Sequence, residues 1–168
     1  TEGIDPTWDA GVVVKTYAIG DYAWIDANRD GVQNEGEPVL PGVTVELVDA
    51  EGNSLEESDV TMTDENGYYL FDEVLSGTYR VKFTLNGEDA GKYTFTDALQ
   101  GEDKATDSDA KRGSGLTEPF QVGYGTVLKG DDFVAYKEAH ADTEIKATVG
   151  VDPTWDAGVV QKSYAIGD

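Results

Sequence analysis

The segment DANRDGVQNEGE, which begins at Asp26, carries oxygen-bearing side chains at the spacing of a calcium-binding loop. It matches the pattern D-x-[DN]-x-[DN]-G-x5-E at its first, third, fifth, sixth and twelfth positions, which are Asp26, Asn28, Asp30, Gly31 and Glu37. Alternate residues of such a tightly turning loop point inward, and calcium takes about six to eight oxygen ligands. We therefore predict a calcium site in this loop.

Two more residues complete the predicted ligand set. Val32 contributes its backbone carbonyl, Asn34 an amide oxygen or a bridging water, and Glu37 a bidentate carboxylate. The alternative is a surface turn that is merely rich in Asp, Asn and Gly. The flanking segments, YAWI before the loop and VTVELV after it, alternate like strands. The helix opening of calcium sensors is therefore unavailable to this loop, which favours a structural role.

Other acidic residues are candidates for binding further ions. Asp107 and Asp109 lie two residues apart in ATDSDAKRG, and Asp156 occupies a strand position in TWDAG. Asp21 and Asp64 sit at the edges of expected strands. Paired carboxylates of this kind bind cations, but they are also common as ordinary loop acids. Both interpretations stay open at this point.

The sequence gives little support to catalysis. A pair of neutral aspartates is conceivable, but the chain has a single histidine, His140, no cysteine, and serines without a recognisable base nearby. We interpret His140 as a polar residue on the face of a strand or helix. A secreted hydrolase would need a cleft with paired acids of perturbed pKa. The chain has no phosphate-binding loop, zinc spacing or basic aromatic stripe.

Charge and composition limit the classes of partner. The chain has 168 residues and a formal net charge of −22, because 34 acidic residues face 12 basic ones. Nucleic acid and anionic membrane surfaces are therefore excluded as expected partners. The acids alternate with apolar residues, which make up 39% of the chain, so we expect a folded domain. Repulsion among the carboxylates opposes compaction unless cations neutralise some of them.

The absence of cysteine removes both disulfides and thiolate sites. An extracellular domain of this kind needs another covalent or metal cross-link, and bound Ca2+ or an internal isopeptide bond would serve. No apolar run approaches the roughly 18 residues of a membrane span, and no signal peptide opens the sequence. We expect a soluble piece of a longer protein, without membrane insertion.

An internal repeat organises the chain. Residues 3–21, GIDPTWDAGVVVKTYAIGD, recur as residues 150–168, GVDPTWDAGVVQKSYAIGD, at an offset of 147 residues and with three differences. Near-identity at surface as well as core positions indicates duplication, as in tandem arrays. We therefore expect several copies in the parent protein. The alternative is two similar edge strands within one domain.

Between the two repeated segments, the pattern predicts strands. Apolar residues alternate in AIGDYAWI, VTVELV, YYLF and TYRVKF, with turn signals such as LPG, AEGN, DENG and LNG between them. Strands separated by turns every 8 to 12 residues or so predict an all-β sandwich. Residues 131–148 are compatible with a helix or with strands, and we favour an extra hairpin there.

These motifs together resemble the SD-repeat B domains of Gram-positive surface adhesins, relatives of the collagen-adhesin B-type fold. The elements that carry the resemblance are G-D-x-x-W, D-x-N-x-D-G-x-Q, D-x-N-G-x-Y and D-S-D, in order from Asp21 to Val160. The resemblance implies an immunoglobulin-like β-sandwich that binds two or three calcium ions. It also implies that the domain stacks in a stalk between a ligand-binding head and the cell wall.

The resemblance assigns ligands and boundaries as well. The first ion would use Asp26, Asn28, Asp30, Val32 and Glu37, and further ions would use Asp107, Asp109 and Asp156, with Asp21 and Asp64 as additional candidates. Residues 1–16 would end a preceding repeat, 17–160 would form one complete sandwich, and 161–168 would link it to the next. The insertion at residues 124–148 departs from the family pattern, which leaves the pairing of the final strand open.

The resemblance also raises an alternative to calcium. Related domains join a Lys near the first strand to an Asn in the last strand, with an acid between them. Here Lys15 and Lys162 lie near the domain junctions, TWDAGVV offers Asp156 and no Asn, and YRVKF lacks the usual acid. Calcium is therefore the expected cross-link.

Our prediction from sequence is a non-enzymatic, calcium-stabilised spacer of an extracellular, cell-wall-anchored adhesin. Its expected partners are neighbouring copies of the same repeat, with a host or cell-surface ligand of the parent protein as a further one. The alternative is a module that itself binds a host protein or glycan through Trp24, the tyrosines or the insertion. Because exposed aromatic residues would favour binding, we note that Trp155 and Tyr68 are expected in the core.

Overall fold

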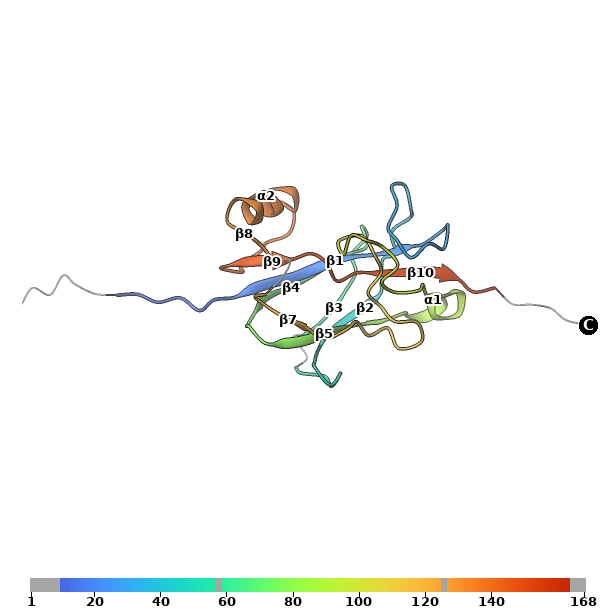
Figure 1. Cartoon of the computed structure of the whole chain (residues 1–168), viewed down its shortest axis with the longest axis horizontal. Helices are drawn as coiled ribbons and strands as arrows, with labels where there is room; N and C mark the ends of the chain where they lie inside the picture. The colour runs from blue at the N-terminus through green and yellow to red at the C-terminus, as the bar shows by residue number, and fades with distance from the viewer. Residues whose placement is uncertain (1–9, 57–58, 125–126, 164–168) are drawn as a thin grey trace, which may run out of the picture.

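Two packed β-sheets form the body of the molecule in the computed structural model, which describes residues 10–56, 59–124 and 127–163 (Figure 1). The strands are β1 (Tyr17–Ile25), β2 (Thr44–Asp49), β3 (Val60–Met62), β4 (Tyr68–Val74), β5 (Thr78–Thr84), β6 (Tyr93–Phe95), β7 (Phe120–Gln121), β8 (Leu128–Lys129), β9 (Gly150–Asp152) and β10 (Ala157–Gln161). The helices are α1 (Gly87–Lys92) and α2 (Asp131–Ala139).

Strand β1 is the centre of the larger sheet. It pairs antiparallel with β4 and parallel with both β9 and β10, and β6 and β8 complete this sheet. Tyr17 pairs with Gly150, whereas Ala23 pairs with Ala157, so the register shifts by one residue between β9 and β10. The additional residue lies within residues 153–156. These residues interrupt the strand pairing beside the middle of β1.

The second sheet has the order β3-β2-β5-β7, and its inner face closes the core. Val45 and Leu47 of β2 alternate with more exposed neighbours, as do Val81 and Phe83 of β5, and all four are essentially buried. Burial of these apolar side chains against the larger sheet is the main stabilising contribution. The predicted all-β sandwich is confirmed.

The insertion contains a helix where we predicted a hairpin. Residues 131–139 form α2, and the strand pairing here is limited to β8 with β9, which enclose residues 130–149. Asp131 and Asp132 occupy the first turn of the helix, where carboxylates interact favourably with the helix dipole. Phe133 is buried with Ala18 and Val151 on the outer face of the larger sheet. The helix packs there because this face would otherwise remain an exposed apolar surface.

The aromatic residues lie largely inside the molecule. Trp24 is fully buried and Tyr68 is nearly so, while Trp155 is partly buried and stacks on Phe120 with ring centroids 4.0 Å apart. A binding role for Trp24 is therefore wrong, because no partner can reach its ring. His140 follows the C-terminus of α2 and stacks on Tyr68 rather than projecting from a face.

The chain enters and leaves the domain at opposite ends (Figure 1). Residues 10–16 lead into β1, and residues 162–163 follow β10. The rest of the predicted terminal repeats, residues 1–9 and 164–168, lies outside the described residues. The predicted boundaries at 17 and 160 coincide with the first residue of β1 and the next-to-last residue of β10.

We predict that replacing Gly20 with alanine destabilises the domain by about 3 kcal/mol. An alanine Cβ at this position would lie 2.4 Å from the Tyr69 carbonyl oxygen of the paired strand. The matched control is Gly91→Ala in α1, where a Cβ meets nothing within 4 Å and alanine favours the helix. Denaturant unfolding measures both, and an unchanged stability of the Gly20 variant would contradict this packing.

Candidate metal centres

The loop between β1 and residue 37 is organised around the Asp26 carboxylate, which is almost completely buried. Its Oδ1 accepts the backbone N–H of Arg29 at 2.6 Å, and its Oδ2 accepts the N–H of Gly31 at 2.9 Å and the Thr96 hydroxyl at 2.6 Å. Hydrogen bonds of this kind fold the chain back on itself. Gly31 has φ = 77°, and a Cβ there would lie 2.7 Å from the Asp97 carbonyl oxygen, so the turn requires glycine.

Oxygen atoms of the predicted ligands converge within this loop. The Nδ2 of Asn34 lies 3.2 and 3.0 Å from the two carboxylate oxygens of Asp30 and 2.9 Å from the Val32 carbonyl oxygen. A second amide, that of Asn28, donates to Asp30 Oδ2 at 2.9 Å. One amide nitrogen therefore has three oxygen neighbours from two of the predicted ligands, which is part of the oxygen environment that calcium takes.

The last predicted ligand closes the loop. Glu37 accepts the N–H of Ala27 through Oε1 at 2.8 Å and the N–H of Asn34 through Oε2 at 3.0 Å. Its carboxylate thus faces both ends of the turn. Hydrogen bonds from Val32, Asn34 and Asn28 lower the pKa of Asp30, which keeps this carboxylate ionised. The residues present fit a calcium ion, with three carboxylates, a carbonyl and two amides able to supply oxygen.

A second group of acids lies between the sheets. Asp21 is in the middle of β1, not at a strand edge as we predicted, and it alternates with the core residues Ile19 and Ala23. Because Ile19 pairs with Asp152 in the parallel strand β9, both side chains lie on this inner face. Asp156, which precedes β10, is fully buried.

The loop of residues 107–110 adds Asp109 to this interior group. The backbone N–H of Asp109 donates to the Asp156 carbonyl at 3.1 Å, and the N–H of Asp156 donates to Asp109 Oδ2 at 3.2 Å. Ser108 is also fixed to β10, since its hydroxyl accepts the Gly158 N–H at 3.0 Å. Asp21, Asp109, Asp152 and Asp156 together are called the interior acid cluster below.

Two members of the interior acid cluster, Asp21 and Asp156, have buried carboxylate oxygens without hydrogen-bond donors in the described part of the chain. Among the described residues, none donates to Asp21 Oδ2 or to either carboxylate oxygen of Asp156. Buried carboxylates without donors are costly when ionised. Burial, followed by repulsion from Asp109 and Asp152, raises the pKa of Asp21 well above its ordinary value. Burial, followed by repulsion from Asp21 and Asp109, does the same to the pKa of Asp156.

Asp109 connects the cluster to solvent. Burial raises its pKa to about 8, with the Asp107 carboxylate adding to the shift. Asp109 and Asp152 line a hollow of about 410 Å³ beside Trp155 and Phe120. This hollow gives an ion a path from the surface to the cluster. Asp21, Asp109 and Asp156 therefore favour the protonated form unless a cation compensates their charge.

Two predicted ligands lie in different settings. Asp107 is buried and pairs with Val32 in an isolated bridge, which places it between the loop and the interior acid cluster. One of its carboxylate oxygens, Oδ1, has no donor among the described residues. Asp64 is exposed, and its Oδ1 accepts the N–H groups of Asn66 and Tyr68. It caps a surface turn, so the structure does not bring it to the cluster.

Sequence reasoning missed Asp152 because it stands outside the motifs that drew attention to the other acids. The signal that would have found it is the D-P-T-W-D spacing, which places Asp152 four residues before Asp156. The cluster forms only because β9 and β10 both pair with β1, a long-range arrangement. No three His, Cys, Asp or Glu side chains form a metal-binding group by themselves in the ranges that the structure describes. An ion at either candidate centre would therefore also need amide, carbonyl or solvent oxygens.

Lys104 opposes the rise in the pKa of Asp107 and Asp109, but no lysine among the described residues contributes to the pKa shifts of Asp21 and Asp156. The charged neighbours that shift the pKa of Asp156 are Asp21, Asp109 and Asp107. Lys162 is engaged elsewhere, since its Nζ donates to the Ala90 carbonyl at 2.7 Å. Lys15 precedes β1 and is exposed. The geometry therefore does not support the isopeptide alternative.

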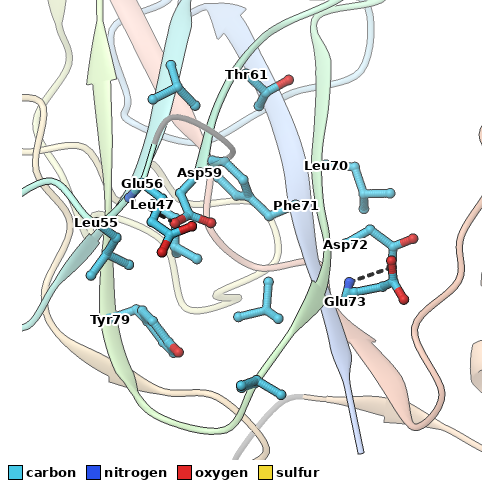
Figure 2. A pocket seen from close by; sticks show the side chains of 13 residues that line it. Leu47, Leu55, Glu56, Asp59, Thr61, Leu70, Phe71, Asp72, Glu73 and Tyr79 are labelled. Carbon is cyan, nitrogen blue, oxygen red and sulfur yellow. Dashed lines mark hydrogen bonds between the residues drawn. The ribbon is translucent and has the colours of Figure 1, made fainter. Parts of the chain in front are cut away.

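A hollow of about 720 Å³ lies apart from both groups of acids, between the edge strands β3 and β4 (Figure 2). Its lining is apolar and acidic, with Leu55, Phe71 and Glu56 among its residues and no His, Lys or Arg. The Asp72 carboxylate at its rim accepts the backbone N–H groups of Lys146 and Ala147, which fixes the insertion to β4. The lining offers no cationic or imidazole group for acid–base chemistry.

Comparison with known proteins agrees with this architecture. The SdrD B-like domain family matches residues 17–135, well over half of the chain. The chain belongs to the SdrD B-like domain family. The matched region begins with β1 and ends within α2, so it contains the calcium-type loop and Asp107 and Asp109. The family resemblance seen in the sequence is confirmed.

Similar proteins extend this result. The chain is 39% identical over 110 residues to serine-aspartate repeat-containing protein D of Staphylococcus aureus strain Newman, covering 66% of this chain and 8% of that protein. It is 37% identical over 117 residues to serine-aspartate repeat-containing protein F of Staphylococcus epidermidis, covering 70% of this chain and 7% of that protein. Colossin-B of Dictyostelium discoideum is 33% identical over 170 residues, or 95% of this chain and 4% of that protein. The chain spans less than a tenth of each relative.

Among the described residues, no helix has the length and apolar character needed to cross a bilayer.

We predict that the calcium-free protein loses stability as the pH rises from about 4 to about 8. Asp21, Asp109 and Asp156 have raised pKa values, so the folded state binds more protons than the unfolded state in this window. The free energy of unfolding therefore falls with pH, and saturating calcium should flatten the slope. Urea unfolding of chelator-treated protein at several pH values measures it.

A single neutralised acid tests the origin of that slope. Asp156→Asn should stabilise the calcium-free protein at pH 8 by at least about 1.4 kcal/mol, the equivalent of one pKa unit, while losing part of the calcium response. Glu65→Gln, at an exposed turn position, removes the same charge and is the control. Equal effects of the two substitutions would show that overall charge, not the interior acid cluster, causes the slope.

Proposed function

We propose that the chain is a calcium-stabilised structural spacer, one repeat in the stalk of a bacterial cell-surface adhesin. In this role it projects a ligand-binding region away from the cell wall. The observation that carries the proposal is the presence of buried carboxylate oxygens without donors among the described residues, one on Asp21 and two on Asp156, in the middle of the fold. Such groups destabilise a domain unless an ion occupies the site, so their retention is consistent with a bound metal.

Calcium binding would couple to folding at both candidate centres. The loop of Asp26 and the interior acid cluster exist only when β1 and β10 are paired, so the unfolded chain offers no comparable site. A ligand that binds only the folded state stabilises it by about 4 kcal/mol at a concentration 1,000 times its dissociation constant. The expected result is a domain that resists unfolding and proteolysis outside the cell, where calcium is abundant. We expect two or three ions.

Family membership supports a structural role. The matched family is a domain of serine-aspartate repeat-containing proteins rather than an enzyme family. The relatives are many times longer than this chain, as expected if the domain is one unit among several. Attachment to the cell wall, exposure outside the cell and tandem neighbours all belong to this proposal. The proposal of a bacterial protein rests on the staphylococcal relatives. A relative from Dictyostelium matches as well.

The alternative of a directly adhesive module has less structural support. Trp24 and Tyr68 are buried, and Trp155 is covered by Phe120. Tyr124 is the one exposed tyrosine among the described residues, at 72%, and its ring is free to face a partner. One exposed ring is far from the clustered aromatic surface that binding of a host glycan or protein requires.

Calcium should raise the melting temperature of the chelator-treated protein by about 10 °C for each saturated site, from about 4 kcal/mol per site and about 2–4 °C per kcal/mol at this chain length. Isothermal titration calorimetry should count two or three ions. Circular dichroism monitors the unfolding. An unchanged melting temperature with no bound calcium would contradict the proposed function.

Substitution within the loop should remove one site selectively. Asp30→Asn should lower the ion count by one and reduce the calcium-dependent shift in melting temperature, with little effect on the calcium-free protein. Asp49→Asn is a matched control, because the Asp49 carboxylate also folds a turn by accepting N–H groups from Glu51 and Asn53 but has no predicted ion. Identical calcium responses of the two variants would exclude the loop as a site.

A further inference from the structure

The extended segment before β1 has the sequence of the last strand of the domain. Residues 10–14 are AGVVV, and β10 is AGVVQ. Yet the two segments lie in opposite environments. Val12 and Val13 are 95% and 82% exposed, whereas the corresponding Val159 and Val160 are 0% and 4% exposed. Two adjacent exposed valines are unfavourable, so the segment is suited to a sheet that is not formed within this chain.

The structure shows the kind of sheet that accepts this sequence. Strand β10 lies between β1, with which it runs parallel, and β6, with which it runs antiparallel. Gly158 fits this position because a Cβ there would lie 2.8 Å from the Trp24 ring. The segment before β1 keeps this glycine, as Gly11, and Asp9 corresponds by sequence to the buried Asp156. A preceding copy of the domain would thus obtain both its last strand and an interior acid from this segment.

The residues after β10 are fixed to the domain that they leave. The Lys162 N–H donates to the Lys92 carbonyl at 2.7 Å, and the Lys162 Nζ donates to the Ala90 carbonyl at 2.7 Å. Arg29 donates from Nη2 to the Gln161 carbonyl at 2.9 Å. By the offset of 147 residues, Gln161 and Lys162 correspond to Val14 and Lys15. These bonds form the first half of a junction between copies.

The residues before β1 are fixed to the domain that they enter. The Thr16 N–H donates to the Thr148 hydroxyl at 2.9 Å, and that hydroxyl donates to the Val14 carbonyl at 3.0 Å. The Val149 N–H donates to the Thr16 carbonyl at 3.0 Å. Ser163 corresponds to Thr16 and keeps its hydroxyl. These bonds form the second half of the junction.

Combining the two halves leaves no free linker residue. The position of Lys15 and Lys162 is held by the preceding copy, and the positions on either side of it are held by the following copy. The carbonyl at the position of Val14 and Gln161 accepts one bond from each side, and a carbonyl oxygen has two lone pairs for this purpose. A chain restrained at every residue cannot act as a flexible spacer.

We propose that residues 10–14 are the last strand of a preceding copy of this domain, and that one continuous extended chain joins the copies at an axial repeat of about 43 Å. The length follows from the register. Residue 157 lies beside residue 23. The path between equivalent positions of neighbouring copies therefore runs along six residues of β1 and then along seven residues of β10 and the link, at about 3.3 Å per residue. The proposal rests on the spacer function only in taking the chain as one unit of a tandem array.

The test uses a two-copy protein made of residues 1–149 followed by residues 3–168, which preserves the period. Because the chain has no cysteine, Glu51→Cys in both copies gives two unique spin-label sites on an exposed turn. Electron–electron distance measurement with saturating calcium should give one narrow peak between about 40 and 50 Å, the range allowed by rotation between copies. A broad distribution, or a distance below about 30 Å, would overturn the proposal.

Two variants of the following copy examine the hydrogen bonds of the junction. Thr148→Val removes the hydroxyl but keeps the branched shape, and it should broaden the distance distribution. Thr148→Ser keeps the hydroxyl and should retain the narrow peak. A narrow peak in the valine variant would overturn the assignment of the junction to these bonds.

Hydrogen exchange provides a second measurement. The amides of Val12 and Val13 should exchange rapidly in the 168-residue chain. In the second copy of the two-copy protein, where they join a sheet of the first copy, they should exchange at least about 100-fold more slowly. Rapid exchange in both proteins would overturn the proposal.

Calcium-dependent unfolding, measured on the same samples, separates the junction proposal from the proposed function. Flexible copies with an intact calcium response would refute only the junction, and a rigid junction without a calcium response would refute only the proposed function.

Discussion

Electrostatic repulsion inside the sandwich is the constraint on which the rest of this structure depends. Asp21, Asp109, Asp152 and Asp156 lie on the inner face where β1, β9 and β10 meet, and the charged groups that shift the pKa values of Asp21 and Asp156 are all acidic. Burial disfavours each charge, and each charge disfavours the others. The fold therefore tolerates these residues either as neutral acids or as ligands of a cation, and at neutral pH the second state is the one we propose.

The two candidate centres are mechanically connected. Asp107 pairs with Val32 of the loop, and two residues later Asp109 is bonded to the start of β10. The Asp26 N–H also donates to the Val159 carbonyl at 2.8 Å, so the beginning of the loop is fixed to the same strand. An ion in either centre would stabilise the pairing of β1 with β10. That pairing joins the beginning of the domain to its end, which is where a stalk under tension must resist separation.

Local patterns in the sequence predicted much of the fold and one of the two centres. The alternation in VTVELV and TYRVKF identified β2 and β5 because each strand has one face in the core. The loop from Asp26 was recognisable as a candidate because all of its predicted ligands are close in sequence. Asp152 was missed and Asp64 was wrongly grouped with Asp21, since the interior acid cluster depends on which strands pair. The hairpin predicted in the insertion was wrong for a related reason, because α2 forms where the outer face of the sheet needs an apolar cover.

The central claim is that Asp21 and Asp156 are ionised in the folded protein only when calcium is present. Carbon-13 NMR of the aspartate side-chain carboxyl groups at pH 7 measures this directly, with and without calcium. Our account predicts that Asp21 and Asp156 are protonated in the calcium-free protein and ionised after calcium is added. Carboxylates that are ionised in both states, or protonated in both, would contradict it.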